Sequence, residues 1–206
     1  MSKTNGRRTA DLVEVALFVA IIIVLANTPL GYIPLGAVNA TTIHIPVIVA
    51  GIVLGWKKGA FLGFFFGITS FLNASFFKPN ITSFLFTPLY PGGNFWSLVI
   101  CFIPRIMIGI VAYLVFKAVF RFLRNENVAL VTAAVLASLI NTVLVMGGAY
   151  VFFADMYAEA IGRPVTDVLA AIMTIVVVNG IPEAACASVL TLGIGKALLV
   201  YKRKYQ

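Results

Sequence analysis

Residues 97–121, SLVICFIPRIMIGIVAYLVFKAVFR, form an apolar run long enough to cross a bilayer as one helix, with a single arginine in its first half. At about 1.5 Å per residue, Arg105 lies roughly 12 Å inside the end of this span. A guanidinium at that depth is costly unless it faces a carboxylate, carbonyl oxygens, water or a ligand. The run therefore predicts a membrane helix whose buried cation is either structurally paired or functional.

The rest of the chain is built in the same way. Of its 206 residues 61% are hydrophobic and 11% charged, and the mean hydropathy is +1.04. Continuous apolar runs favour helices over a transmembrane barrel, whose strands would alternate. We expect an all-α, polytopic membrane protein, one domain over 1–206, with six transmembrane helices at 11–27, 37–56, 59–77, 97–121, 128–153 and 168–200.

Charge sets the orientation. The net charge is +8, and most basic residues flank alternate span ends, whereas Lys78 and Arg163 lie in the opposite loops. The positive-inside rule then predicts that both termini are cytoplasmic. Because these cations sit at helix ends rather than on a soluble basic face, no nucleic-acid partner is implied.

Several kinds of chemistry find no support in the sequence. There is one histidine, and both cysteines, Cys101 and Cys186, fall inside predicted spans, so neither a metal site nor a disulfide is expected. No Gly-rich phosphate loop of the Walker type occurs, so the chain is not expected to drive transport by its own ATP hydrolysis. We expect no cofactor.

Three prolines lie within or beside predicted spans. Pro46, Pro104 and Pro182 cannot donate to the carbonyl four residues earlier, which leaves a kink or an acceptor for a ligand. Polar side chains accompany them: His44, Arg105, Asn179 and Glu183. Asn179 and Glu183 share a helix face, so Arg105, Glu183 and Asn179 are candidates for one hydrogen-bonded network, which is either a purely structural pair or part of a pocket.

Further polar and aromatic residues cluster near the same side of the membrane. His44 is interpreted either as a ligand contact or as a helix-start histidine bonded to backbone. The second outer loop and its borders, together with the fifth span, supply amides, hydroxyls and an aromatic that suit a small polar ligand or simply an interfacial loop: Asn73, Asn80, Thr82, Ser83, Asn94, Trp96 and Asn141.

Small residues recur at helix spacing. Ala16 and Ala20 form a small-xxx-small pair in the first span, a pattern that permits close helix approach but is weak by itself. Glycines at every fourth position between Gly51 and Gly67 predict closely packed helices.

Taken together, Thr41–Ile48, Gly55–Gly67, Ser83–Pro88, Pro104-Arg105 and Asn179–Glu183 resemble the substrate-binding S components of energy-coupling factor transporters, the vitamin importers of bacteria. The resemblance covers nearly the whole chain. It implies a six-helix subunit of the bacterial cell membrane that is not an enzyme. It also implies that the subunit binds a vitamin near its outer face, closes its first outer loop over the vitamin, and works with a transmembrane coupling subunit and two ATPases. Ala16 and Ala20 match the alanine motif by which such subunits dock on the coupling subunit.

The likeness is closest to pantothenate-specific members, and pyridoxine- or hydroxymethylpyrimidine-specific members are the alternatives. For pantothenate, the resemblance implies that Arg105 meets the carboxylate. The polar groups would be met by His44, Asn80, Asn94 and Asn141, with Trp96 or Phe84 as an apolar wall. If Glu183 neutralises Arg105, a neutral pyridine or pyrimidine becomes the more natural ligand.

Two other classes stay open at this point. A membrane-embedded enzyme usually needs paired acids or a histidine with a nucleophile, and one histidine with one deep glutamate falls short of that. A structural membrane subunit would use the same polar groups only to fix helix packing.

Overall fold

The computed structural model describes residues 3–35 and 38–205, and their side chains for 9–31 and 41–204. Seven helices make up most of it: α1 Lys3–Asn27, α2 His44–Leu54, α3 Trp56–Leu72, α4 Phe95–Leu123, α5 Glu126–Ile161, α6 Val168–Val178 and α7 Gly180–Tyr205. A π-helical turn, Asn73–Phe77, continues α3. A small antiparallel hairpin, β1 Tyr32–Leu35 and β2 Val38–Thr41, joins α1 to α2 and pairs Tyr32 with Thr41.

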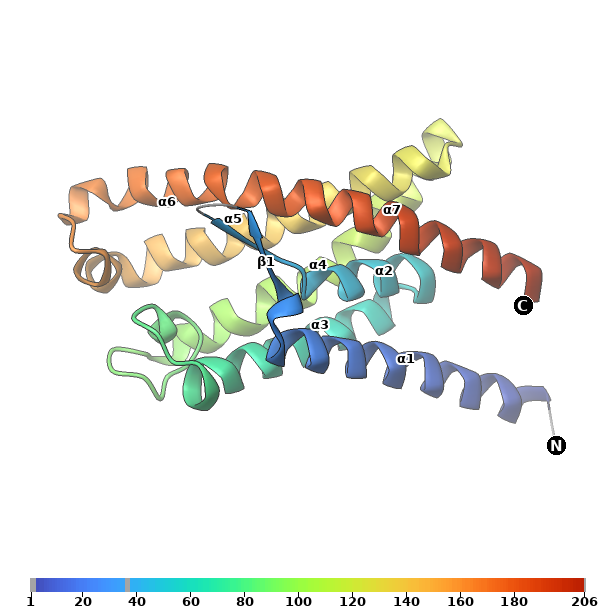
Figure 1. Ribbon diagram of the computed structural model, residues 1–206, viewed down its shortest axis with the longest axis horizontal. Helices are drawn as coiled ribbons and strands as arrows, with labels where there is room; N and C mark the ends of the chain where they lie inside the picture. Colours follow the sequence, from blue (N-terminus) through green and yellow to red (C-terminus); the bar gives the residue numbers. More distant parts are fainter. Residues whose placement is uncertain (1–2, 36–37, 206) are drawn as a thin grey trace.

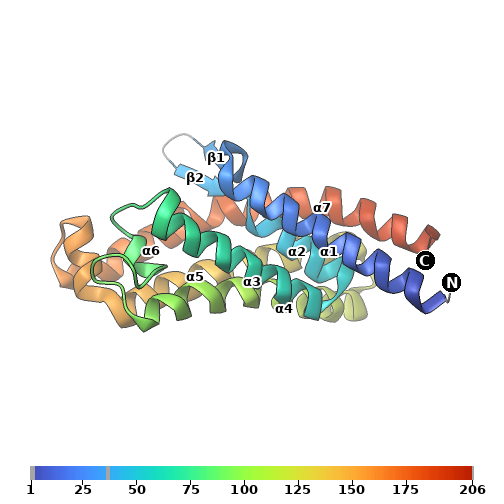
Figure 2. The ribbon, with the colours of Figure 1, turned by 90° about the horizontal axis from the view of Figure 1, so that it is seen from below.

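The helices lie along the long axis of an elongated bundle, and the two chain ends emerge at the same end of it (Figures 1 and 2). Helix α4 occupies the centre, because it packs against α2, α3 and α5, while α5 also packs against α7. Basic residues lie at this end, Lys57 and Lys58 in the first turn of α3 and Arg124 between α4 and α5, so the positive-inside rule assigns it to the cytoplasm. We call it the basic end and the opposite end the outer end.

The expected all-α membrane architecture is confirmed. Among the described residues, five helical stretches are long and apolar enough to cross a membrane, and α2 is a sixth, shorter apolar helix. Many large apolar side chains on these helices are exposed, as a lipid-facing surface requires.

Two predicted boundaries are corrected. The span expected over 37–56 begins at His44, because residues 38–41 pair as β2; residue 37 itself is outside the described residues. The span expected over 168–200 is two helices, since α6 ends at Val178 and α7 starts at Gly180. Hydropathy detects neither change, because the second strand and the helix break both lie beside long apolar runs and blend into them.

The three prolines occupy different positions. Pro46 and Pro182 lie in the first turns of α2 and α7, where a missing N–H costs little. Pro104 lies inside α4 and removes a hydrogen bond from its interior. Of the three prolines, only Pro104 frees a carbonyl in the interior of a membrane helix.

Glycines bring α2, α3 and α4 into backbone contact. A β-carbon added at Gly51 would collide with Gly109 of α4, one added at Gly59 with Gly51 of α2, and one added at Gly63 with the carbonyl oxygen of Arg105. Gly55, by contrast, forms the turn between α2 and α3 with φ 97°. The predicted close packing holds for the helical glycines, and it fixes the backbone of Arg105 against α3.

Replacing Gly109 by alanine is therefore expected to cost about 1–3 kcal/mol of stability, the usual penalty for overpacking. The matched control is Gly147→Ala on α5, where an added β-carbon meets nothing within 4 Å. Thermal unfolding of both purified variants checks this. Equal midpoints for the two variants would show that α3 and α4 can separate at no cost.

Candidate functional site: a cationic cavity near the outer end

A cavity of about 400 Å³ lies between the end of α1, the hairpin, α3, its π-helical turn, the following loop and α4. Its volume is in the range of small-molecule sites, about 300–1,000 Å³. The described lining residues are mostly polar or aromatic and include no acid: Ala26, Thr41, Ile43, Phe66, Thr69, Ser70, Asn73, Ala74, Lys78, Asn80, Ser83, Phe86 and Arg105.

Arg105 is the deepest cation of this cavity. Its residue is 7% exposed, and its Nη1 donates a hydrogen bond to the carbonyl oxygen of Ile100 at 2.9 Å. That is the carbonyl that Pro104 leaves without its helical donor, so proline and arginine compensate one another within one turn. The guanidinium also lies over the Phe86 ring, 4.7 Å from its centroid, and 5.6 Å from that of Phe66. Two aromatic faces and one carbonyl thus fix the direction of the charge.

Lys78 supplies a second cation at the mouth of the cavity. It follows the π-helical turn, and its Nζ lies 3.4 Å from the carbonyl oxygen of Ala26. The Nδ2 of Asn73 donates to the same carbonyl at 3.1 Å. Since the end of α1 is held by these two side chains, the position of the first outer segment depends on residues that line the cavity.

Asn80 and Ser83 order the loop between the π-helical turn and α4, which lines the cavity together with Arg105. The Asn80 side-chain oxygen accepts hydrogen bonds from the backbone N–H and the hydroxyl of Thr82, both at 2.9 Å. The Asn80 backbone N–H in turn donates to the Ser83 hydroxyl at 2.8 Å. The amide nitrogen of Asn80 is left to meet other acceptors, which suits an exposed residue in the cavity lining.

Glu183 connects the helix break to the hairpin. Its Oε1 accepts a hydrogen bond from the backbone N–H of Thr41 at 2.9 Å, and its own N–H donates to the carbonyl of Asn179 at 3.0 Å. Thr41 lines the cavity. This hydrogen bond joins α7 to β2 through two residues that are 142 positions apart in the sequence. It places Glu183, an acid predicted for the site, beside a residue that lines the cavity.

The other predicted site residues do not line this cavity. Asn94 caps α4, accepting from the Trp96 N–H at 2.8 Å, and Trp96 stacks on Phe152 with ring centroids 4.0 Å apart. Phe84 packs in the core with Phe153. His44 is buried and Asn141 partly buried, and in the part of the chain that the structure describes the His44 Nε2 and Asn141 Oδ1 atoms are buried without a hydrogen-bond partner.

Sequence reasoning misses part of the lining. From the sequence, Lys78 is only an outer-loop charge, and Thr69, Ser70 and the aromatics Phe66 and Phe86 do not stand out. One signal is present, because Thr69, Ser70 and Asn73 recur at helix spacing at the outer end of an otherwise apolar span. The aromatic rings carry no signal, since phenylalanine is common in any membrane helix.

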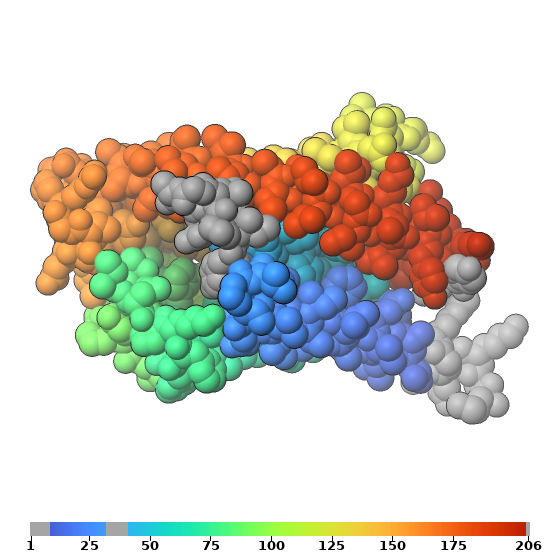
Figure 3. Space-filling model, viewed as in Figure 1, coloured from blue at the N-terminus to red at the C-terminus, as the bar shows by residue number. Residues whose placement is uncertain are grey.

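The predicted docking residues lie at the surface of α1. Ala16 and Ala20 are both exposed and lie on the side of the helix away from the buried Ile22. Figure 3 shows α1 and α7 along one face of the molecule with α2 between them. This placement leaves a small-residue surface open to lipid or to another protein.

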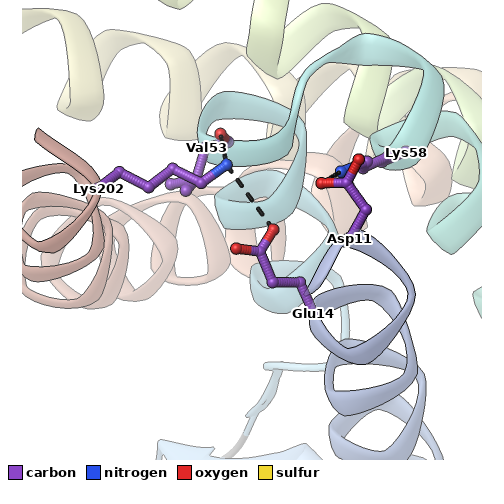
Figure 4. Close-up of polar contacts among 5 residues, drawn as sticks. All are labelled: Asp11, Glu14, Val53, Lys58 and Lys202. Atoms are coloured by element: carbon purple, nitrogen blue, oxygen red, sulfur yellow. Dashed lines mark hydrogen bonds and ion pairs between the residues drawn. The ribbon is translucent and has the colours of Figure 1, made fainter. Parts of the chain in front are cut away.

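Ion pairs hold α1 at its basic end (Figure 4). Lys58 donates to Asp11 at 2.6 Å, and Lys202 lies 3.7 Å from Glu14 while donating to the carbonyl of Val53 at 3.2 Å. Helix α1 is thus bound by Lys58 of α3 and Lys202 of α7, and Lys202 is itself held by the Val53 carbonyl of α2. They fix the rotation of α1 that keeps its alanine pair outward.

A bundle of membrane helices with a polar, cationic cavity near its outer end defines a membrane protein that captures a small ligand. Comparison with known proteins gives the family. Residues 10–195 match the family described as "ECF transporter, substrate-specific component". The chain belongs to this family, and is therefore a multi-pass cell-membrane protein that serves as the substrate-binding component of a transporter.

Two curated relatives are similar over nearly their whole length. The "Pantothenic acid transporter PanT" of Lactococcus lactis subsp. cremoris is 35% identical over 198 residues, covering 93% of this chain and 94% of the relative. The "Pantothenate transporter PanT" of Leuconostoc mesenteroides subsp. mesenteroides is 33% identical over 205 residues, covering 95% of each. The resemblance inferred from the sequence motifs is confirmed at the level of the family.

Proposed function

We propose that this chain binds pantothenate in the outer cavity and delivers it for ATP-driven import. The observation that carries the proposal is the charge of the cavity: Arg105 and Lys78 line it, and no described lining residue is an acid. Pantothenate is an anion with an amide, two hydroxyls and a pair of geminal methyls. The names of the two relatives point to the same substrate.

The lining matches these groups one by one. Arg105 is oriented by the Ile100 carbonyl and by two rings, so it can meet a carboxylate with little loss of side-chain freedom. Hydroxyl and amide partners are available on Thr69, Ser70, Asn73 and Asn80. Ile43, Phe66 and Phe86 offer an apolar wall for the methyls, in place of the wall expected from Trp96 or Phe84.

The hairpin is proposed as the cover of this cavity. Strand β2 ends at Thr41, which lines the cavity, and Glu183 holds that residue by its backbone N–H. Movement of this hairpin would open the cavity toward the outer end without moving the helices behind Arg105. The expected closure of the first outer loop over the vitamin is consistent with this arrangement.

The energy for import is proposed to come from partners. The sequence carries no Walker-type loop, so two ATPase subunits would hydrolyse ATP. A transmembrane coupling subunit would connect them to this chain, with Ala16 and Ala20 docking α1 on it. In this role the chain binds and carries a substrate and is not an enzyme.

Ligand screening on the detergent-purified chain tests the proposal. Thermal stability is measured with pantothenate, pyridoxine, hydroxymethylpyrimidine, riboflavin and folate, followed by calorimetry on each hit. A ligand at one hundred times its Kd stabilises a one-site native state by about 2.7 kcal/mol, which is readily detected. If only pyridoxine or hydroxymethylpyrimidine stabilises the chain, that compound takes the place of pantothenate as the proposed substrate. If no compound changes the thermal stability, the chain is better explained as a structural subunit.

Lys78 tests whether the positive charge at the edge of the cavity contributes to pantothenate binding. Because Lys78 is exposed, Lys78→Ala is expected to weaken pantothenate binding by only about 2- to 5-fold, the usual effect of an exposed charge. The effect should shrink as salt is raised. Lys57→Ala, the loss of an exposed lysine at the basic end, is the control and should leave the Kd unchanged when both are measured by calorimetry.

A further inference from the structure

A second groove lies at the basic end of α4. It has a volume of about 490 Å³ and is separate from the outer cavity, with a lining of apolar and basic side chains: Ile52, Tyr113, Phe116, Lys117, Phe120, Arg121 and Arg124. The substrate role described above makes no use of it. The positive-inside rule accounts for cations at this end, but it does not require three of them to line one groove with three aromatic rings.

The three cations come from the last two turns of α4 and from the residue that caps it. Lys117 and Arg121 are four residues apart and share one face of α4, about 6 Å along the helix. Arg124 directly follows the helix as its C-cap, in left-handed conformation with φ 53°, and lines the same groove. Lys117 lies 5.7 Å from the centroid of Tyr113, and the rings of Phe116 and Phe120 are stacked at 5.9 Å. The groove is therefore apolar toward the membrane interior and cationic toward the basic end.

The three cations are exposed, and none takes part in an ion pair between described residues. The nearest acid in sequence, Glu126, is bound by Arg203 of α7. The helix dipole favours cations near the C-terminus of α4. That effect is confined to the last turn, so it does not explain Lys117. The three cations are therefore available to bind an external anion.

We propose that this groove binds one anionic phospholipid of the inner leaflet. The phosphate would lie on Lys117, Arg121 and Arg124, and an acyl chain would follow the aromatic rings and Ile52 toward the membrane interior. Charge complementarity selects an anionic lipid over an apolar helix, because the groove combines three cations with apolar and aromatic side chains at the basic end of the bundle. The proposal is independent of the identity of the transported vitamin.

The test uses the full chain, delipidated in detergent, and compares phosphatidylglycerol with phosphatidylcholine of identical acyl chains. We expect phosphatidylglycerol to raise the thermal unfolding midpoint at lower concentration than phosphatidylcholine. In Lys117→Gln/Arg121→Gln the concentration needed for half of this effect should increase at least threefold. The charge-preserving variant Lys117→Arg/Arg121→Lys should respond like the unmodified chain.

A matched control separates the groove from general surface charge. Lys57→Gln/Lys196→Gln removes the same charge from exposed positions outside the groove and should leave the lipid response unchanged. Should the first double variant fail to fold, Arg121→Gln alone serves the same comparison.

Three results would overturn the proposal. Equal responses to the two lipids would show that no anion is selected. Equal losses in the two glutamine variants would show that only net charge matters. Loss of assembly with the coupling subunit in Lys117→Gln/Arg121→Gln, together with an unchanged lipid response, would mark the groove as a protein docking surface.

Discussion

Arg105→Ala is expected to weaken pantothenate binding by about 10- to 150-fold, since a hydrogen bond to a charged group contributes roughly 1.5–3 kcal/mol. The arginine residue is 7% exposed, and its guanidinium is oriented into the cavity by the Ile100 carbonyl and the Phe86 ring. Neither contact requires the ligand, so the charge is fixed before binding. Calorimetry on the purified variant measures the loss.

The neutral alcohol analogue pantothenol is the matched ligand control. It keeps the hydroxyls, the amide and the methyls but lacks the carboxylate, so its affinity should change far less than that of pantothenate. Arg105→Lys keeps the charge but loses the planar group that lies over Phe86, and its affinity for pantothenate should fall between those of the unmodified chain and the alanine variant. Equal losses for the acid and the alcohol would show that Arg105 only supports the helix around Pro104.

Ala16→Arg or Ala20→Arg is expected to abolish uptake while leaving pantothenate affinity within about twofold. Both alanines are exposed on α1, and neither lines the outer cavity. A long charged side chain would prevent the close helix approach that a small-residue surface permits. Uptake by vesicles that contain the complete transporter, and calorimetry on the isolated chain, measure the two properties separately.

Ala118→Arg is the control for a charge added to a membrane helix. Ala118 is an exposed alanine of α4, and its side chain lies outside the lining of the outer cavity. This variant should retain uptake. If Ala118→Arg also loses uptake, the loss in the α1 variants is explained by impaired membrane insertion. If the α1 variants retain uptake, the prediction that the alanine pair docks on the coupling subunit is wrong.

Prediction of the site from sequence succeeds where the residue type is informative by itself. A cation in the middle of an apolar span has few permitted environments, so the sequence alone singles out Arg105, which lines the outer cavity. Asn80 is found because an outer loop rich in amides is expected near the ligand. Asn94 shows the limit of this reasoning, because the same amide chemistry also caps a helix, and the sequence alone does not separate the two uses.

Length and hydropathy alone determined that the chain is an all-α membrane protein, and the positions of its cations predicted which end faces the cytoplasm. These properties follow from the cost of exposing backbone or charge to lipid, which each segment meets independently of the others. The tertiary structure decided what depends on partners distant in sequence: the hairpin in place of the start of a helix, its link to Glu183, and the phenylalanine rings around Arg105. Contacts of this kind form only when separate helices meet, so no local pattern of residues predicts them.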